Sequence, residues 1–283
     1  MIKVLLLADT HLGFDQPQRP RVERRRRGPD FFANTRRALE PARLGEIDLV
    51  VHGGDLLYRS KVPPALVSAA LEPLLEVADL GVPVFLVPGN HERSAVPFPL
   101  LACHENLHVF DRPRTVVLKV GGCDLAVAGF PCERDRIREQ FGNLVRTALG
   151  EGEDADIRLL CLHQTVEGAR VKGYTFRSGD DVVPGSDIPG GFAAVLSGHI
   201  HRSQILTHDL AGRPLSAPVV YPGSVERTSL AEREEAKGFW LLDLEAGQMD
   251  GGRLARSEFR ELPARPMHLI VVDATNLGAE DLD

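Results

Sequence analysis

Residues 2–13 read IKVLLLADTHLG, an apolar run interrupted only by Lys3 that leads into Asp9 and His11. A run of this length and composition is typical of a buried strand. Side chains two positions apart in an extended segment share a face, so Asp9 and His11 are expected to project together from the strand end. The pair alone is a weak indication of a metal site, because polar side chains commonly end strands.

The same arrangement recurs twice in the first hundred residues. Residues 47–52 form a second apolar run, which leads through a glycine turn to Asp55. Residues 82–87 form a third run, which leads to Asn90 and His91. An Asp on a glycine turn is ordinary turn chemistry when taken alone. Three successive strands that each end in a candidate ligand are much harder to explain as turn chemistry.

Helices are expected between these strands. One is predicted over residues 30–44, with Asp30 as its N-cap, and one over residues 63–80, which begins with prolines and ends before a glycine. The resulting βαβαβ order predicts neighbouring parallel strands. Open α/β sheets bind ligands at the carboxyl ends of such strands, where the polar residues lie.

The second half of the chain is richer in strand patterns. Residues 116–120 and 124–128 flank a Gly-Gly pair, which is a hairpin signal, and residues 133–149 are expected to be helical. Residues 171–191 are glycine-rich and polar, which predicts a long loop. A β-rich end with Gly and Pro punctuation follows over residues 204–244.

Two apolar runs in this half also end in histidines. Residues 158–162 lead to His163, and residues 193–197 lead to His199 and His201. The five strand ends together supply one spare histidine, His91, and seven candidate metal ligands: Asp9, His11, Asp55, Asn90, His163, His199 and His201. This inventory predicts two adjacent metal ions with a catalytic proton donor, as in a metal-dependent phosphoesterase.

The overall composition is that of a globular protein, with 43% hydrophobic and 26% charged residues in 283. The N-terminal apolar run is too short to cross a bilayer and no cleavage site follows it, so a cytoplasmic protein without a membrane partner is expected. The cysteines are far apart and form no Cys-x-x-Cys pair, which favours free thiols: Cys103, Cys123, Cys132 and Cys161.

Charge is distributed unevenly along the chain. The net charge is -7, yet residues 19–37 contain eight arginines, among them the run Arg24, Arg25, Arg26 and Arg27. A solvated loop and a segment that tracks a DNA backbone are both compatible with such a stretch. Its position directly after the first metal motif favours DNA contact.

The ordered series of motifs resembles that of the calcineurin-like metallophosphoesterases over roughly residues 1–230. Three stretches are similar to those of the SbcD-type DNA repair nucleases: ADTHLG at residues 8–13, GDLL at 54–57 and YPGSVE at 221–226. The resemblance implies an α/β fold of two packed mixed β-sheets, a β-sandwich flanked by helices. It also implies a Mn-dependent DNA nuclease, with exonuclease or endonuclease action, in DNA repair.

The resemblance further assigns a role to each candidate side chain. One divalent ion would be held by Asp9, His11, Asp55 and His201. The second would be held by Asp55, Asn90, His163 and His199. His91 would be the catalytic histidine that assists hydroxide attack on the phosphodiester. Mixed imidazole and oxygen ligands suit Mn, Fe or Zn, and the resemblance favours Mn.

Two features depart from the SbcD-type pattern. Many such enzymes have a histidine three residues after the bridging Asp, where this chain has Tyr58, a candidate substrate contact. A metallophosphoesterase domain over residues 1–265 leaves only residues 266–283, a tail that resembles the start of a capping domain. The resemblance implies DNA as partner, a homodimer and, for a longer native chain, an SbcC-like ATPase.

Two other functions compete with a nuclease. A phosphodiesterase of the same fold would act on cyclic nucleotides or other small diesters. A non-catalytic scaffold would be expected to lose some ligands or the catalytic histidine, whereas this chain has all eight residues. The arginine stretch and the YPGS segment favour the nuclease.

Overall fold

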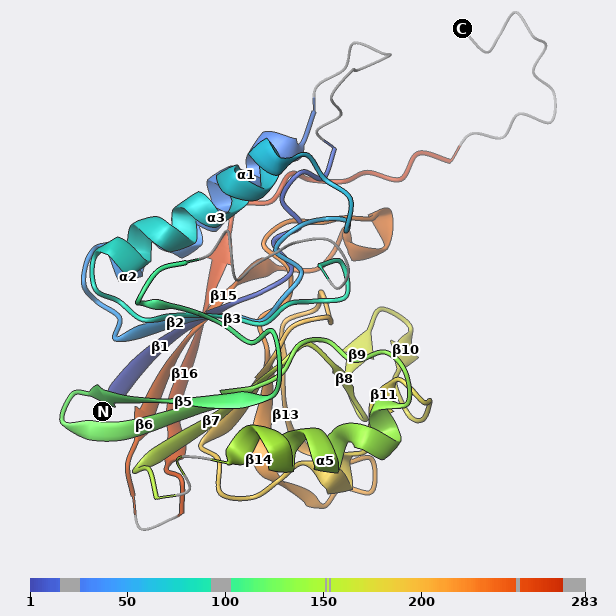
Figure 1. Cartoon of the computed structure of the whole chain (residues 1–283). Helices are drawn as coiled ribbons and strands as arrows, with labels where there is room; N and C mark the ends of the chain where they lie inside the picture. Colours follow the sequence, from blue (N-terminus) through green and yellow to red (C-terminus); the bar gives the residue numbers. More distant parts are fainter. Residues whose placement is uncertain (16–25, 93–102, 151, 153, 248–249, 272–283) are drawn as a thin grey trace, which may run out of the picture.

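Two six-stranded mixed sheets pack face to face, and helices cover the outer face of each sheet (Figure 1). The computed structural model describes residues 1–15, 26–92, 103–150, 152, 154–247 and 250–271. The first sheet has the order β16 (Arg253–Leu262), β15 (Lys237–Glu245), β1 (Ile2–Leu7), β2 (Leu49–His52), β3 (Val84–Leu86), β4 (Leu107–Val109). The second has the order β13 (Gln204–His208), β14 (Pro214–Tyr221), β12 (Ala194–Ser197), β7 (Ile157–Leu162), β6 (Cys123–Gly129), β5 (Arg114–Val120).

The helices form the two outer layers of the sandwich. Three lie on the first sheet: α1 (Gly28–Ala38), α2 (Glu40–Arg43) and α3 (Pro64–Asp79). The second sheet is covered by α5 (Ile137–Leu149) and by two short strand pairs, β8 (Thr165–Val166) with β11 (Val182–Val183) and β9 (Arg170–Val171) with β10 (Tyr174–Thr175). The 3-10 turns are η1 (Gly185–Asp187) and η2 (Leu230–Glu232). In the described part of the chain, every helix is too short or too polar to span a bilayer.

The alternation of side chains in β1 explains why the strand is apolar at every position except Lys3, which is exposed. Ile2, Val4 and Leu6 point into the layer between the sheets, whereas Leu5 and Leu7 point into the layer under the helices. Each is fully buried, and burial of such a side chain stabilises the fold by about 1.5–3 kcal/mol. The continuous apolar run from Val4 to Leu7 is therefore a consequence of burial on both faces.

Parallel pairing aligns the strand ends that carry the polar motifs. In the first sheet β1, β2, β3 and β4 are parallel neighbours, and in the second sheet β6, β7, β12 and β14 are parallel neighbours. An isolated parallel bridge between Ala8 and Ser224 joins the two sheets directly beyond β1 and β14. The carboxyl ends of both parallel groups therefore meet at one edge of the sandwich.

Several predicted elements differ in detail from the observed ones. The first helix begins at Gly28 with Arg27 as N-cap, so Asp30 lies in its first turn rather than at the cap. The helix expected from residue 133 begins at Ile137, because Arg136 has a left-handed backbone with φ 59°. The loop predicted over residues 171–191 contains β10, β11 and η1. The strands β4 and β16 were not predicted, because neither is a long apolar run.

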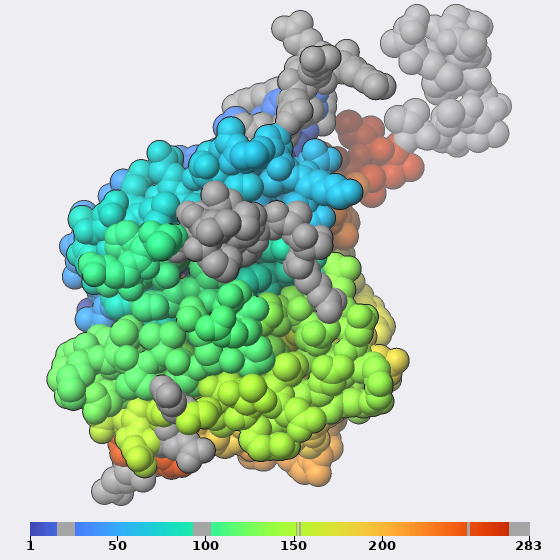
Figure 2. All heavy atoms as spheres, in the orientation of Figure 1, coloured from blue at the N-terminus to red at the C-terminus, as the bar shows by residue number. Residues whose placement is uncertain are grey.

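The end of the described chain leaves the body of the molecule beside α1 (Figures 1 and 2). β16 ends at Leu262, and Arg265 still forms an ion pair with Asp30 of α1, at 2.5 Å between Nε and Oδ2. Beyond this contact, Ile270 and Val271 are 81% and 83% exposed. The packed structure therefore extends to about residue 265.

Candidate metal centre

Four of the side chains at the shared edge sit on left-handed backbone. Asp9, His11, Asp55 and His199 have φ values of 49°, 42°, 52° and 82°. Non-glycine residues rarely adopt this region, and each such residue costs about 1–3 kcal/mol unless its surroundings compensate. In each case the sharp turn redirects a side chain from the strand axis toward the same space. This concentration of strain makes the edge a candidate functional site.

Glycines allow the turns to approach one another closely. A Cβ on Gly54 would collide with the imidazole of His163, and a Cβ on Gly89 would collide with Asp55. A Cβ on Gly198 would collide with the carbonyl of Gly53, across the boundary between the two sheets. The glycine in each of these motifs is therefore required for contact between turns.

The first group of candidate ligands joins β1 to the turn after β12. The Nε2 atoms of His11 and His201 face each other at 2.9 Å. Asp9 Oδ1 lies 3.9 Å from His201 Nε2, and both Asp9 oxygens accept the backbone N–H of His199, at 3.1 and 3.2 Å. Asp9, His11 and His201 thus place one ligand atom each within 4.8 Å of the others.

The second group joins the turn after β3 to those after β7 and β12. Asn90 Oδ1 lies 3.1 Å from His163 Nε2 and 2.8 Å from His199 Nδ1. The rings of His163 and His199 pack edge to face with their centroids 5.1 Å apart. The amide oxygen of Asn90 therefore shares one small space with two imidazole nitrogens.

Asp55 lies between the two groups. Its Oδ2 is 4.0 Å from His11 Nε2 and 3.5 Å from His163 Nε2. Its Oδ1 accepts the backbone N–H of His91 at 2.9 Å. The two oxygens are therefore not equivalent, and Oδ2 is the one that faces both groups.

Outer hydrogen bonds fix which nitrogen of each ring faces inward. His163 Nδ1 lies 2.7 Å from the carbonyl of Gly53, and His201 Nδ1 lies 3.2 Å from Glu232 Oε1. A carbonyl and a carboxylate can only accept hydrogen bonds, so Nδ1 carries a proton in both rings. The Nε2 atom of each ring is then directed into the centre, where its lone pair can bind a metal once the ring is neutral.

His91 differs from these histidines in its exposure. Its Nδ1 is in close contact with the carbonyl of Tyr58, and its Nε2 lies 3.8 Å from Asp55 Oδ2. Its side chain is 34% exposed, compared with 25% for His201 and 5% for His11, and the side chain of His163 is fully buried. His91 therefore stands at the mouth of the centre. Its geometry also allows a ligand group with His11 and Asp55.

Burial and mutual charge perturb the pKa values in the centre. Burial and the neighbouring imidazoles lower the pKa of His11 and of His199 to about 3. Burial acts to lower the pKa of His163, but the carboxylates of Asp55 and Asp9 outweigh burial and raise it to about 9. Burial raises the pKa of Asp9 to about 6. In the metal-free protein a proton on His163 therefore offsets the Asp55 charge, which is the role a bound cation would take over.

The predicted substrate contacts lie apart from this cluster or outside the described residues. Arg24 and Arg25 are outside the described residues. Arg26 Nη1 pairs with Asp15 at 3.2 Å, and Arg27 Nη2 pairs with the buried Glu226 at 3.1 Å. The ring of Tyr58 packs edge to face on Phe14, and only its carbonyl contacts His91.

Three residues that contact the site were not predicted from the sequence. Glu92 is buried and accepts the backbone N–H groups of Leu57 and Gly89, at 2.7 and 2.8 Å, which ties two of the turns together. Glu232 contacts His201, and Arg134 donates from Nη2 to the Asn90 carbonyl at 3.3 Å. Glu92 follows His91 directly, so its proximity was a usable signal. Glu232 and Arg134 are distant in sequence from the residues that they contact.

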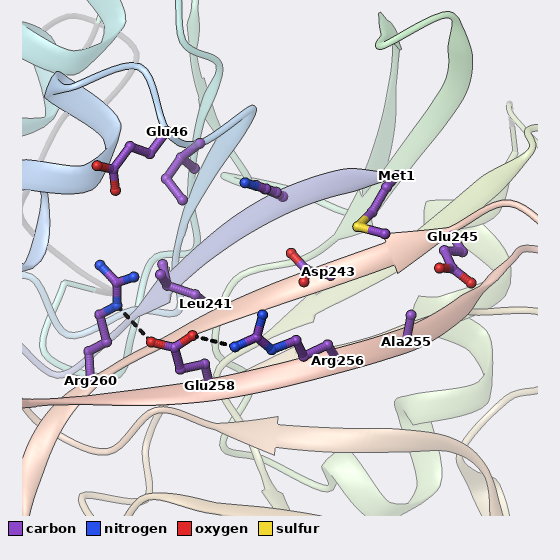
Figure 3. A pocket seen from close by; sticks show the side chains of 11 residues that line it. Met1, Glu46, Leu241, Asp243, Glu245, Ala255, Arg256, Glu258 and Arg260 are labelled. Carbon is purple, nitrogen blue, oxygen red and sulfur yellow. Dashed lines mark hydrogen bonds and ion pairs between the residues drawn. The ribbon is translucent and has the colours of Figure 1, made fainter.

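A separate cavity of about 520 Å³ lies on the helix side of β15 and β16 (Figure 3). Three of its charged side chains pair with each other: Arg256 donates to Glu258 at 3.0 Å and Arg260 donates to Glu258 at 3.1 Å. None of the predicted site residues lines it. The cavity is therefore distinct from the candidate metal centre.

Comparison with known sequences identifies relatives of this chain. It is 27% identical to the DNA double-strand break repair protein Mre11 of Aeropyrum pernix, over 99% of this chain and 65% of the relative. It is 30% identical to Mre11 of Haloferax volcanii, over 96% of this chain and 55% of the relative. The metallophosphoesterase YhaO of Bacillus subtilis is 25% identical, over 77% of this chain and 50% of its own length. The chain thus spans about 55–65% of these Mre11 relatives.

Solved structures share the fold. A dimetal phosphatase from Danio rerio superposes with a TM-score of 0.51 at 13% identity, covering 91% of this chain and 98% of that one. A hypothetical protein from Thermus thermophilus superposes with a TM-score of 0.51 at 18% identity, covering 93% and 100%. At these sequence identities, the structural similarity shows a shared fold and nothing about function. The family model for calcineurin-like phosphoesterases matches residues 2–203, which include every residue of the candidate centre. The chain therefore belongs to the calcineurin-like phosphoesterase family.

Proposed function

We propose that the protein is a two-metal phosphodiesterase that acts on DNA. The position of Asp55 carries this proposal, because its Oδ2 faces candidate ligand atoms of both groups. A carboxylate in this position can be shared by two cations. The first ion would be held by Asp9, His11, Asp55 and His201, and the second by Asp55, Asn90, His163 and His199.

The chemistry of the donors fits divalent cations. Two buried carboxylates and an amide oxygen converge with imidazole nitrogens whose lone pairs point inward. Mixed nitrogen and oxygen sets of this kind suit Mn, Fe or Zn, and we propose Mn because the resemblance to the SbcD-type nucleases favours it. When bound, such a pair neutralises phosphate charge and provides a nucleophile from water at neutral pH.

The chain's own residues then divide the remaining tasks. His91 stands at the exposed mouth of the centre, where a phosphodiester would enter, and the Tyr58 carbonyl holds its Nδ1 proton. Its Nε2 is thereby directed toward the Asp55 side, where it can give a proton to the leaving oxygen. The exposure of His91 favours this role over that of a ligand.

DNA as substrate is supported by the relatives and by the charge pattern. Several relatives are named as DNA double-strand break repair proteins. The arginine-rich segment that includes Arg24 and Arg25 follows the first metal motif in the sequence. We propose that this segment contacts the DNA backbone, whereas Arg26 and Arg27 anchor its end through Asp15 and Glu226.

We further propose that the catalytic domain ends near residue 265. Arg265 contacts Asp30 and its carbonyl accepts Arg227 Nη1 at 2.8 Å, whereas the described residues that follow are largely exposed. Residues 266–283 would begin a capping domain, in keeping with the greater length of the relatives. A homodimer, an SbcC-like ATPase partner and a cytoplasmic location belong to the same proposal.

The test is cleavage of circular single-stranded DNA and linear duplex DNA with Mn, compared with bis-p-nitrophenyl phosphate as a small diester. We expect all cleavage to depend on Mn. Opening of the circle would establish endonuclease action, and shortening of the duplex alone would indicate an exonuclease. Hydrolysis of the small diester without DNA cleavage would instead support a small-molecule phosphodiesterase. A protein that binds Mn and cleaves neither substrate would be a scaffold.

A further inference from the structure

The imidazole of His201 is held from behind by a carboxylate. Glu232 Oε1 lies 3.2 Å from His201 Nδ1, and the hydroxyl of Thr228 lies 3.3 Å from the same nitrogen. Thr228 Oγ1 also donates to Glu232 Oε1 at 2.6 Å, and Ser229 Oγ donates to it at 3.2 Å. The carboxylate oxygen that faces His201 is therefore itself fixed by two hydroxyl groups.

The other oxygen of Glu232 is bound by a buried lysine. Lys237 Nζ lies 2.6 Å from Glu232 Oε2, and its side chain is fully buried. The same Nζ donates to the carbonyl of His201 and to Ser224 Oγ, each at 2.9 Å. Lys237 therefore holds the backbone of His201, while Glu232 holds its ring.

This support distinguishes His201 from His163. His163 Nδ1–H donates a hydrogen bond to a neutral backbone carbonyl, that of Gly53. His201 Nδ1–H instead donates to a carboxylate, that of Glu232. A carboxylate is the stronger acceptor, and it makes the opposite ring nitrogen a stronger ligand. The two halves of the centre thus have differently supported imidazoles.

We propose that Glu232 is a positioning residue that fixes the tautomer and orientation of His201 and so sets the metal affinity of the half of the centre formed with Asp9 and His11. This inference rests on the proposed two-metal function. The same inference assigns a structural role to the YPGSVE segment, because Ser224 in this segment accepts a hydrogen bond from Lys237. The alternative is a purely structural role in which Glu232 only neutralises the charge of Lys237.

Titration calorimetry with Mn separates the two roles. Glu232→Gln keeps the shape of the side chain but removes its charge, and we expect it to weaken one of two Mn sites about 10–100-fold while the other site keeps its affinity. Glu232→Asp keeps a negative charge beside Lys237 but places it on a shorter side chain, so the contact with His201 Nδ1 should lengthen and the same site should weaken. Glu234→Gln is the matched control: Glu234 lies in the same segment, pairs with Lys172 at 2.7 Å, and should leave both sites unchanged.

The double variant Glu232→Gln with Lys237→Met decides between the roles. If Glu232 positions His201, the double variant binds at least as weakly as Glu232→Gln, because Lys237→Met also removes the donor to the His201 carbonyl. Recovery of wild-type affinity in the double variant would show that Glu232 only neutralises Lys237 and would overturn the inference.

The variant His201→Ala distinguishes failure of the inference about Glu232 from failure of the proposed two-metal function. If His201→Ala leaves both sites intact, the proposed ligand set fails. If His201→Ala removes one site while Glu232→Gln and Glu232→Asp weaken neither site, only the inference about Glu232 fails.

Discussion

At the scale of single residues, His91 is the side chain that we propose as the general acid. It lies within reach of Asp55, yet it is more exposed than His11 or His163. Replacement His91→Asn should leave Mn binding unchanged and lower turnover of a small diester by about 10²–10⁴-fold, as expected for loss of a general acid. Calorimetry and steady-state kinetics on one preparation measure both quantities. Unchanged turnover in the fully loaded variant would remove His91 from the mechanism.

The proton on His163 makes metal binding depend on pH. Its pKa is raised to about 9 in the metal-free protein, so at pH 7 the ring is protonated and a metal ion must displace the proton. Mn affinity should therefore rise with pH up to about 9. Calorimetric titrations at pH 7 in buffers of different ionisation enthalpy should report the release of about one proton for the site that contains His163. Binding without proton release at that pH would contradict this protonation state.

At the scale of elements, the turns after the strands carry the site, and their glycines are the most sensitive positions. Gly54 has φ 107°, and a Cβ there would strike the ring of His163. Gly54→Ala should lower the free energy of unfolding by more than about 2 kcal/mol and weaken metal binding.

The control for Gly54→Ala is Gly81→Ala. Gly81 has φ 82° but open space around its Cβ position. This variant should cost about 1–2 kcal/mol for the left-handed backbone and leave metal binding unchanged. Chemical denaturation and Mn titration measure both effects. Equal loss of metal affinity in the two variants would mean that contact with His163 is not the reason for the glycine.

The arginine-rich segment supplies a second prediction at this scale. Replacement of Arg24 and Arg25 by Ser should weaken DNA binding, lower the slope of its salt dependence by about 1–2 and spare the small diester. Arg27→Ser is the structural comparison, because its guanidinium pairs with the buried Glu226. We expect Arg27→Ser to lower thermal stability. Equal loss on DNA and on the small diester in the Arg24 and Arg25 variant would count against DNA contact.

Elements with a strong local signal were predictable from the sequence. The core strands β1, β2, β7 and β12 are apolar because they are buried on both faces, and the hairpin of β5 and β6 has its Gly-Gly turn. The strand β16 was not predictable in this way. It mixes charged, polar and apolar residues without a regular alternation at an exposed edge, and nine residue pairs with β15 stabilise it rather than its own composition.

The candidate site likewise has residues that could be proposed from the sequence and residues that could not. Candidate ligands that directly follow apolar runs could be proposed from the sequence, because strand and candidate ligand are adjacent in it. Glu232 could not, since its contact with His201 spans 31 residues and depends on the fold of the η2 turn. Its pattern Ser229-x-x-Glu232 matches a helix N-cap signal and indicates local structure rather than a metal site.

At the scale of the whole molecule, the centre exists because two sheets end at one edge. Asp9, His11, Asp55 and Asn90 come from the first sheet and its turns, while His163 and the His199–His201 turn come from the second. The bridge between Ala8 and Ser224 and the contact of Gly53 with Gly198 hold the sheets together at this point. Each group of ligands therefore forms only when both sheets are packed.

The number of Mn ions bound per chain tests the two-metal proposal most directly. Equilibrium dialysis with elemental analysis should find two ions in the wild-type protein. It should find one in His201→Ala, which removes a ligand of a single half. In Asp55→Asn, both sites should weaken together because Oδ2 faces both groups. A single ion in the wild-type protein at saturating Mn, or an Asp55→Asn variant that keeps two tightly bound ions, would contradict the shared two-metal centre.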